Sequence, residues 1–195
     1  SNDKRNLMHT IERQRDQLAH AGIKKIVPLK TDWLFGRKFT GKQIRGKFAI
    51  LAPGGSAKRK YKRIPTEVFI NLSKLFIKNN ITPVLIGTKS ESLLCKKIES
   101  QCNGIINLCE KLELIELASF SRRASIAIGN DTGPMHMFAL CGLKTIVFFT
   151  KYSNPDLCAP KGKDVKVLVY NGDKINFLKL IEKVMDLKNI NNLKY

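Results

Sequence analysis

The chain has 195 residues, of which 43% are hydrophobic, and its formal net charge at pH 7 is +19. This length allows one well-buried domain with a short additional segment. The chain contains no run of about 20 apolar residues, so no transmembrane helix is expected. Residues 1–15 are charged and lack the apolar centre of a secretory signal, so we do not expect them to be a signal peptide. The cysteine pattern described below leads us to expect a cytoplasmic protein.

The positive charge favours an anionic partner, which is nucleic acid, an anionic membrane surface or a phosphorylated ligand. Lys and Arg are spread along the chain except for one cluster, Lys-Arg-Lys-Tyr-Lys-Arg at residues 58–63. No helix-turn-helix, RNP or zinc-finger pattern is present, so nucleic acid is not expected as a partner. Composition explains much of the charge, and we expect the remainder to attract the chain peripherally to the inner face of the cytoplasmic membrane.

The cysteines are odd in number and include no Cys-x-x-Cys pair: Cys95, Cys102, Cys109, Cys141 and Cys158. This pattern indicates reduced thiols rather than a disulfide framework or a zinc site. No other spacing of His, Cys and carboxylates suggests a metal site.

Residues 5–21 are predicted to form a helix that ends at Gly22, with an apolar stripe of Leu7, Ile11, Leu18 and Ala21. Residues 23–45 read as a basic loop. We therefore divide the chain into residues 1–45, a helix and linker connecting to another domain, and residues 46–195, a ligand-binding domain. His9 and His20 have no partners in any pattern and are expected at the surface.

Strands and helices alternate from Phe48 onward. Helices are predicted at 66–78, with Thr66 as its cap, at 90–101, with Leu93, Leu94 and Ile98 facing inward, and at 112–120, 134–141 and 175–187. Short apolar runs predict strands at 48–52, 83–87, 105–108, 125–128, 145–149 and 165–169. This alternation is typical of an α/β, Rossmann-like parallel sheet of about six strands with helices on both faces. Such sheets bind ligands at the carboxyl ends of their strands.

The segment Gly-Asn-Asp-Thr-Gly-Pro-Met-His at residues 129–136 follows a predicted strand and opens a helix. A helix start offers unpaired amides and a partial positive charge, which suit a diphosphate. Gly133 permits close approach of a ligand, and Pro134 fits the first helical turn. Asp131 could accept bonds from sugar hydroxyls or from amides of its own loop. The alternative is that Asp131 or Thr132 simply caps the helix.

Two further loops follow predicted strands. The segment Pro53-Gly54-Gly55-Ser56 could approach a phosphate, which Lys62 or Arg63 could neutralise, although a solvated basic loop is the alternative. It is neither a Walker loop nor the Rossmann cofactor fingerprint. In the segment 87–91, Glu91 could bind ribose hydroxyls, or it could be an ordinary first-turn glutamate.

Taken in order, these loops resemble the C-terminal domain of glycosyltransferase family nine, the heptosyltransferases of lipopolysaccharide core synthesis, over about residues 48–185. Its most specific carrier is Asp-Thr-Gly-Pro-x-His at residues 131–136. The other carriers are Ala-Pro-Gly-Gly-Ser at 52–56, Lys-Arg-Ile-Pro at 62–65, Pro-Val-Leu-Ile-Gly at 83–87 with Glu91, and Asn-Leu at 107–108 with Lys111 and Leu114.

The resemblance implies one half of a GT-B enzyme that binds a nucleotide-sugar donor, typically ADP-heptose, without a required metal or cofactor. It implies that Lys62 neutralises a phosphate, that Thr132 and Gly133 offer amides to the diphosphate, that Asp131 contacts the sugar and that Glu91 meets the ribose. Residues near Lys111 and Leu112 would line the base pocket, and His136 matches the motif. The complete set of expected donor-binding residues is Gly54, Gly55, Ser56, Lys62, Gly87, Glu91, Lys111, Asp131, Thr132, Gly133 and His136.

In the family, the catalytic base and the site for a lipid-linked saccharide acceptor lie in an N-terminal domain, so this chain is expected to be inactive alone. It departs from the family at Thr150, where glycine is usual, and at Glu110, where a small residue is common.

Two other interpretations of the sequence stay open. One is another GT-B enzyme with a different sugar nucleotide, such as an epimerase, and the other is a non-catalytic basic module that binds membranes or nucleic acid.

Overall fold

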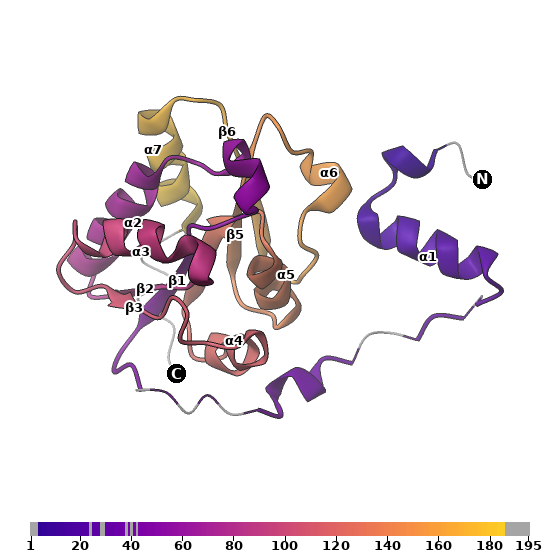
Figure 1. The fold of residues 1–195 in the computed structure, drawn as a ribbon, viewed down its shortest axis with the longest axis horizontal. Coiled ribbons are helices and arrows are strands. Elements are labelled where there is room, and N and C mark those ends of the chain that lie inside the picture. Colours follow the sequence, from indigo (N-terminus) through magenta and orange to yellow (C-terminus); the bar gives the residue numbers. More distant parts are fainter. Residues whose placement is uncertain are drawn as a thin grey trace.

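The computed structural model describes residues 4–23, 25–27, 30–37, 39, 41 and 43–185. Its centre is a six-stranded sheet in the order β3-β2-β1-β4-β5-β6, in which every neighbouring pair is parallel (Figure 1). The strands are β1 (Phe48–Ala52), β2 (Thr82–Leu85), β3 (Ile106–Asn107), β4 (Ile126–Asn130), β5 (Thr145–Thr150) and β6 (Val165–Tyr170). The predicted parallel α/β sheet is therefore confirmed.

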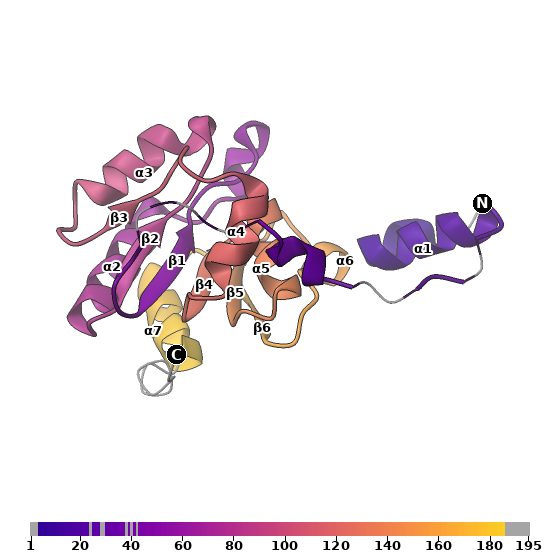
Figure 2. The same ribbon diagram turned by 90° about the horizontal axis from the view of Figure 1, so that it is seen from below.

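Both faces of the sheet are buried because successive side chains of a strand point to opposite faces. One face packs against α2 (Thr66–Lys78), α3 (Ser92–Glu99) and α7 (Lys174–Met185). The other packs against α4 (Leu114–Ser121) and α5 (Gly133–Leu140). Figure 2 shows these two helical layers with the sheet between them. In β1, Ala49 and Leu51 face the first layer, whereas Phe48 and Ile50 face the second.

Several predicted helix ends need correction. Thr66 is the first residue of α2 and not its cap, because Pro65 holds the cap position and makes no side-chain bond there. The predicted helix 90–101 begins as a 3-10 turn, Lys89–Glu91, and becomes α-helical only at Ser92. Leu93 is 84% exposed, because α-helical spacing places it on the side of α3 away from Ile98, which is buried as predicted. The sequence reading also missed a short helix, α6 (Pro155–Cys158), which Asn154 caps.

The N-terminal segment forms a 3-10 turn, Arg5–Leu7, and the helix α1 (Thr10–His20), which has no buried residue. In Figure 1, α1 lies outside the sheet domain and beside α6. Two contacts join them: His9 Nε2 lies 3.0 Å from the Ala159 carbonyl, and Thr10 Oγ1 donates to the Leu157 carbonyl at 2.9 Å. The surface position expected for His9 is therefore wrong, because its side chain is buried against α6 and also caps α1.

A second 3-10 turn, Asp32–Phe35, lies against α4, where the Arg122 guanidinium stands over the Phe35 ring at 4.7 Å. Among the described residues, no helix combines the length and hydrophobicity that crossing a bilayer requires. The five cysteines are unbridged, and burial raises the pKa of Cys95, Cys102 and Cys109.

Candidate donor-binding site

The candidate site lies where the strand order reverses. β1 and β4 are neighbours in the sheet, and the chain leaves them toward β2 on one side and β5 on the other. The loop after β1 begins at Pro53, and the loop after β4 begins at Asp131, so both stand at the carboxyl edge of the sheet. Parallel α/β sheets bind ligands at such a switch point. The position expected for the loop at Asp131 is confirmed.

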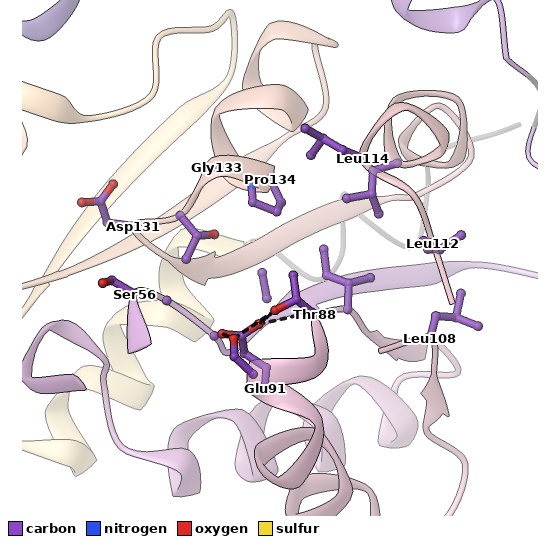
Figure 3. A pocket seen from close by; sticks show the side chains of 17 residues that line it. Ser56, Thr88, Glu91, Leu108, Leu112, Leu114, Asp131, Gly133 and Pro134 are labelled. Carbon is purple, nitrogen blue, oxygen red and sulfur yellow. Dashed lines mark hydrogen bonds between the residues drawn. The ribbon is translucent and has the colours of Figure 1, made fainter. Parts of the chain in front are cut away.

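A cleft of about 640 Å³ opens between these loops. Its size is within the range of about 300–1,000 Å³ that small-molecule sites occupy. Polar residues gather at one end, where Figure 3 shows Ser56 and Asp131. The opposite end is apolar and is lined by Ile86, Leu108, Leu112, Leu114, Leu117 and Pro134.

The first loop is open toward the cleft. A Cβ added at Gly54 would lie 2.4 Å from Glu91 Cγ, so this glycine is required by the packing of Glu91. Gly87 serves the same side chain, since an added Cβ there would lie 2.9 Å from Glu91 Cβ. None of the described residues accepts a hydrogen bond from the backbone N–H of Gly55 or Ser56. Two donors therefore remain for a ligand.

Asn130 fastens the first loop to the second. This residue is 1% exposed, and its Nδ2 donates to the carbonyls of Pro53 at 2.8 Å and Gly54 at 3.1 Å. Its Oδ1 accepts from the Ile64 amide at 3.2 Å. The side chain thus binds three backbone groups and sets the spacing of the two loops. Asn130 was not among the predicted site residues, although it precedes Asp131 in the motif.

The start of α5 faces the cleft. Thr132 holds the cap position, but its side chain makes no capping bond, so the alternative that Thr132 simply caps the helix is wrong. Instead its Oγ1 is buried without any hydrogen-bond partner in the described part of the chain. A Cβ added at Gly133 would meet nothing within 4 Å, so the cleft reaches the backbone there. Helix-start amides and an unpaired hydroxyl are well suited to an anionic ligand.

Glu91 closes the floor of the cleft within a capping box. Its Oε2 accepts from the Thr88 amide at 2.9 Å and from Thr88 Oγ1 at 2.6 Å, while Oε1 accepts from Ser90 Oγ at 2.7 Å (Figure 3). Burial alone would raise the pKa of Glu91, but these bonds and the charge of Arg63 outweigh it, so the pKa is lowered. The first-turn role considered for Glu91 is therefore present in the fold, and the carboxylate also lines the cleft.

A smaller cavity of about 120 Å³ adjoins the polar end of the cleft and shares Gly55, Ser56 and Asp131 with it. It adds three cationic side chains, Arg59, Lys62 and Arg63. Arg63 donates to the Gly55 carbonyl and lies 3.5 Å from Glu91 Oε1, but its buried Nε has no partner among the described residues. A Cβ at Gly55 would lie 3.5 Å from Arg63 Nε and 3.7 Å from Thr132 Cγ2, so both residues that carry an unpaired atom border Gly55.

The predicted residues fall into three groups. The large cleft brings together Gly54, Gly55, Ser56, Gly87, Glu91, Asp131, Thr132 and Gly133. Lys62 lines the smaller cavity. The remaining two stand outside both cavities. His136 Nε2 lies 3.7 Å from Asp131 Oδ1, and Lys111 Nζ donates to the Asn107 carbonyl at 3.0 Å in an exposed position.

Sequence reasoning missed Asn130 and Ser153 as site residues and named Arg63 only as an alternative to Lys62. The motif that contains Asn130 could have revealed it, whereas only the folded structure brings Ser153 to the site. Glu110, the position at which we expected a departure from the family, has φ of 66°, in the left-handed region that favours glycine. Within the described ranges, no three His, Cys, Asp or Glu side chains are placed to hold a metal ion.

The chain resembles solved glycosyltransferases in fold. Escherichia coli heptosyltransferase WaaC with ADP is 21% identical with a TM-score of 0.69, and the match covers 91% of this chain and 57% of that one. WaaC with ADP-2-deoxy-2-fluoro heptose is 20% identical with a TM-score of 0.64, covering 95% and 56%. A family 9 glycosyl transferase from Veillonella parvula is 21% identical with a TM-score of 0.63, covering 73% and 47%.

The chain thus spans about half the length of these solved structures. No curated protein matches the sequence. Residues 3–181 match glycosyltransferase family 9 (heptosyltransferase), which is most of the chain. The protein therefore belongs to glycosyltransferase family 9.

Proposed function

We propose that this chain is the donor-binding part of a heptosyltransferase and that its donor is ADP-heptose. The observation that carries the proposal is the pair of buried polar atoms without hydrogen-bond partners, Thr132 Oγ1 and Arg63 Nε, in two residues that both lie next to Gly55. Buried polar groups are nearly always hydrogen-bonded, so two such groups beside one open cleft indicate a polar ligand. Family membership and the WaaC structures with ADP and an ADP-heptose analogue support the identity of that ligand.

The two ends of the cleft suit the two ends of this donor. The apolar end, around Leu108 and Leu112, suits a nucleobase, and the ribose then lies against Glu91. The diphosphate receives the amides of Ser56 and Gly133 and the Thr132 hydroxyl. Lys62 adds positive charge from the smaller cavity.

The sugar extends from the diphosphate toward Asp131, because this residue lines both cavities. A carboxylate repels phosphate but accepts hydrogen bonds from sugar hydroxyls. His136, at 3.7 Å from Asp131, orients that carboxylate in this arrangement. Lys111 has no contact with either cavity, so we assign it at most to the rim of the base pocket.

We further propose that the catalytic base and the acceptor site belong to a part of the protein outside these residues. The acceptor is then a lipid-linked saccharide of the lipopolysaccharide core, and the enzyme works in the cytoplasm, in peripheral contact with the inner membrane. The supporting facts are the share of the solved relatives that this chain spans and its net charge of +19.

A panel of ADP, UDP, GDP and ADP-heptose tests the proposal through the thermal unfolding midpoint of the chain. A ligand that binds only the folded state raises that midpoint according to its concentration relative to Kd. We expect ADP and ADP-heptose to raise it and UDP and GDP to have less effect. Preference for UDP or GDP would indicate a different donor. No response to any nucleotide, together with binding to anionic vesicles or nucleic acid that falls steeply with salt, would favour a non-catalytic basic module.

A further inference from the structure

Lys62 and Asp131 border the same cavity of about 120 Å³, yet they form no direct ion pair. The hydroxyl of Ser153 lies between them. Lys62 Nζ donates to Ser153 Oγ at 3.2 Å, and Ser153 Oγ donates to Asp131 Oδ2 at 3.3 Å. One hydroxyl thus joins the cation to the carboxylate.

Opposite charges that share a small and partly buried cavity attract each other strongly. In a direct ion pair, the Lys62 ammonium and the Asp131 carboxylate would bind each other and would be less available to a ligand. A serine hydroxyl can donate one hydrogen bond and accept two, so it can satisfy both groups at the same time. Its presence therefore keeps the two charges separate. The other hydrogen-bonding positions of Lys62 and Asp131 are then available to a ligand in the cavity.

We propose that Ser153 is a positioning residue that keeps Lys62 available to the diphosphate and Asp131 available to the sugar of a bound nucleotide sugar. The inference rests on the donor-binding function proposed above. It assigns a role to the loop after β5, at which this chain departs from the family pattern at Thr150.

The loop that carries Ser153 is held in place without any ligand. The Ser153 amide donates to the Thr150 carbonyl at 3.0 Å, which forms a turn directly after β5. Thr150 Oγ1 donates to the Tyr61 carbonyl at 3.5 Å, and the Tyr61 and Tyr152 rings meet edge-on at 5.1 Å. Because Tyr61 precedes Lys62, these contacts bring the loop and the lysine together before a donor arrives.

The other neighbours of Asp131 cannot replace Ser153 as a spacer. His136 approaches Oδ1, on the other side of the carboxylate, at 3.7 Å. Cys158 Sγ lies 3.7 Å from Oδ2 and is a weak donor. Neither group forms a hydrogen bond with Lys62, whose Nζ donates to Ser153. Removing the Ser153 hydroxyl therefore leaves Lys62 and Asp131 free to pair directly.

The test is NMR titration of the 195-residue chain with ADP and with adenosine, which measures weak as well as tight binding. We expect Ser153→Ala to weaken ADP binding by roughly tenfold, as for the loss of one hydrogen bond to a charged group. Adenosine binding should not change, because adenosine has no phosphate for Lys62. Ser153→Thr keeps the hydroxyl and should restore ADP affinity. Ser100→Ala is the matched control, since Ser100 Oγ bonds only the Lys97 carbonyl at an exposed helix end.

A second arm measures the coupling between the two residues. In a Lys62→Ala background, Ser153→Ala should cause no further loss of ADP affinity, because the residue that it positions is absent. Unchanged ADP affinity in Ser153→Ala, an equal loss for adenosine or additive losses in the double variant would each overturn the inference. If the unsubstituted chain binds neither ligand, the donor-binding function itself fails. If it binds both normally and Ser153→Ala has no effect, only the role of Ser153 fails.

Discussion

At the scale of single residues, the proposed diphosphate site depends most on Lys62. Lys62 borders the smaller cavity, and its ammonium donates a hydrogen bond to the uncharged Ser153 hydroxyl. We expect Lys62→Ala to weaken ADP binding by about 1.5–3 kcal/mol, the scale of a hydrogen bond to a charged group. Isothermal titration at two salt concentrations measures this loss.

Lys58→Ala and Lys60→Ala are matched controls for Lys62→Ala, because both lysines are exposed in the same 3-10 segment, Ala57–Lys62, which is kinked at Arg59. Their effects should be small and should disappear at high salt, as expected for screened surface charges. Equal losses of ADP affinity in all three variants would show that the basic cluster is a general patch that attracts anionic surfaces.

Asn130 is a second residue with a defined role. Its buried side-chain amide makes hydrogen bonds to backbone groups of Pro53, Gly54 and Ile64. Asn130→Ala leaves these groups buried and partly unpaired. We expect the free energy of unfolding in urea to fall by about 1–3 kcal/mol. Asn103→Ala, at an exposed turn position, should change it by less than about 0.5 kcal/mol. A similar stability for both variants would mean that the loops hold together without Asn130.

At the scale of elements, the capping box of Glu91 predicts how the start of α3 responds to pH. The pKa of Glu91 is lowered in the folded chain, so its ionisation favours folding. The contribution is complete above the usual value of 4.5 and is lost as the pH falls through the lower, folded pKa. Glu91→Gln should therefore destabilise the chain at pH 7 and flatten the acid side of its stability profile. Urea midpoints between pH 7 and pH 3 measure this, and parallel profiles would contradict it.

Most elements follow from local pattern, and the exceptions have physical causes. The continuous apolar runs of β1 and β4 predicted the sheet and its carboxyl-edge loops. The pattern at 90–101 did not reveal the 3-10 start of that helix. The inward position expected for Leu93 is wrong because α-helical spacing places this residue on the side of α3 away from Ile98. His9 is buried by Ala159, a partner 150 positions away in sequence, and Ser153 enters the site through contacts with Lys62 and Asp131. Long-range contacts of this kind leave no periodic signal.

At the scale of the whole molecule, donor binding and sugar transfer should separate. The chain spans about half the length of the solved family structures, and we place the catalytic base and acceptor site outside it. We expect this chain to bind ADP-heptose but to release no ADP in the presence of a lipid-linked saccharide acceptor. A coupled assay for released ADP measures turnover. Turnover that is lost in Asp131→Ala would show that the described residues include a complete active site.

The central claim is that the cleft at the switch point between β1 and β4 binds a nucleoside diphosphate. Backbone amide NMR spectra recorded during titration with ADP test it most directly, because each amide reports its own surroundings. We predict that the largest shifts occur at Gly55, Ser56, Thr132 and Gly133, with smaller shifts at Leu108 and Leu112, which line the base end of the cleft. Shifts confined to residues 58–60, or spread evenly over the basic surface, would contradict the claim.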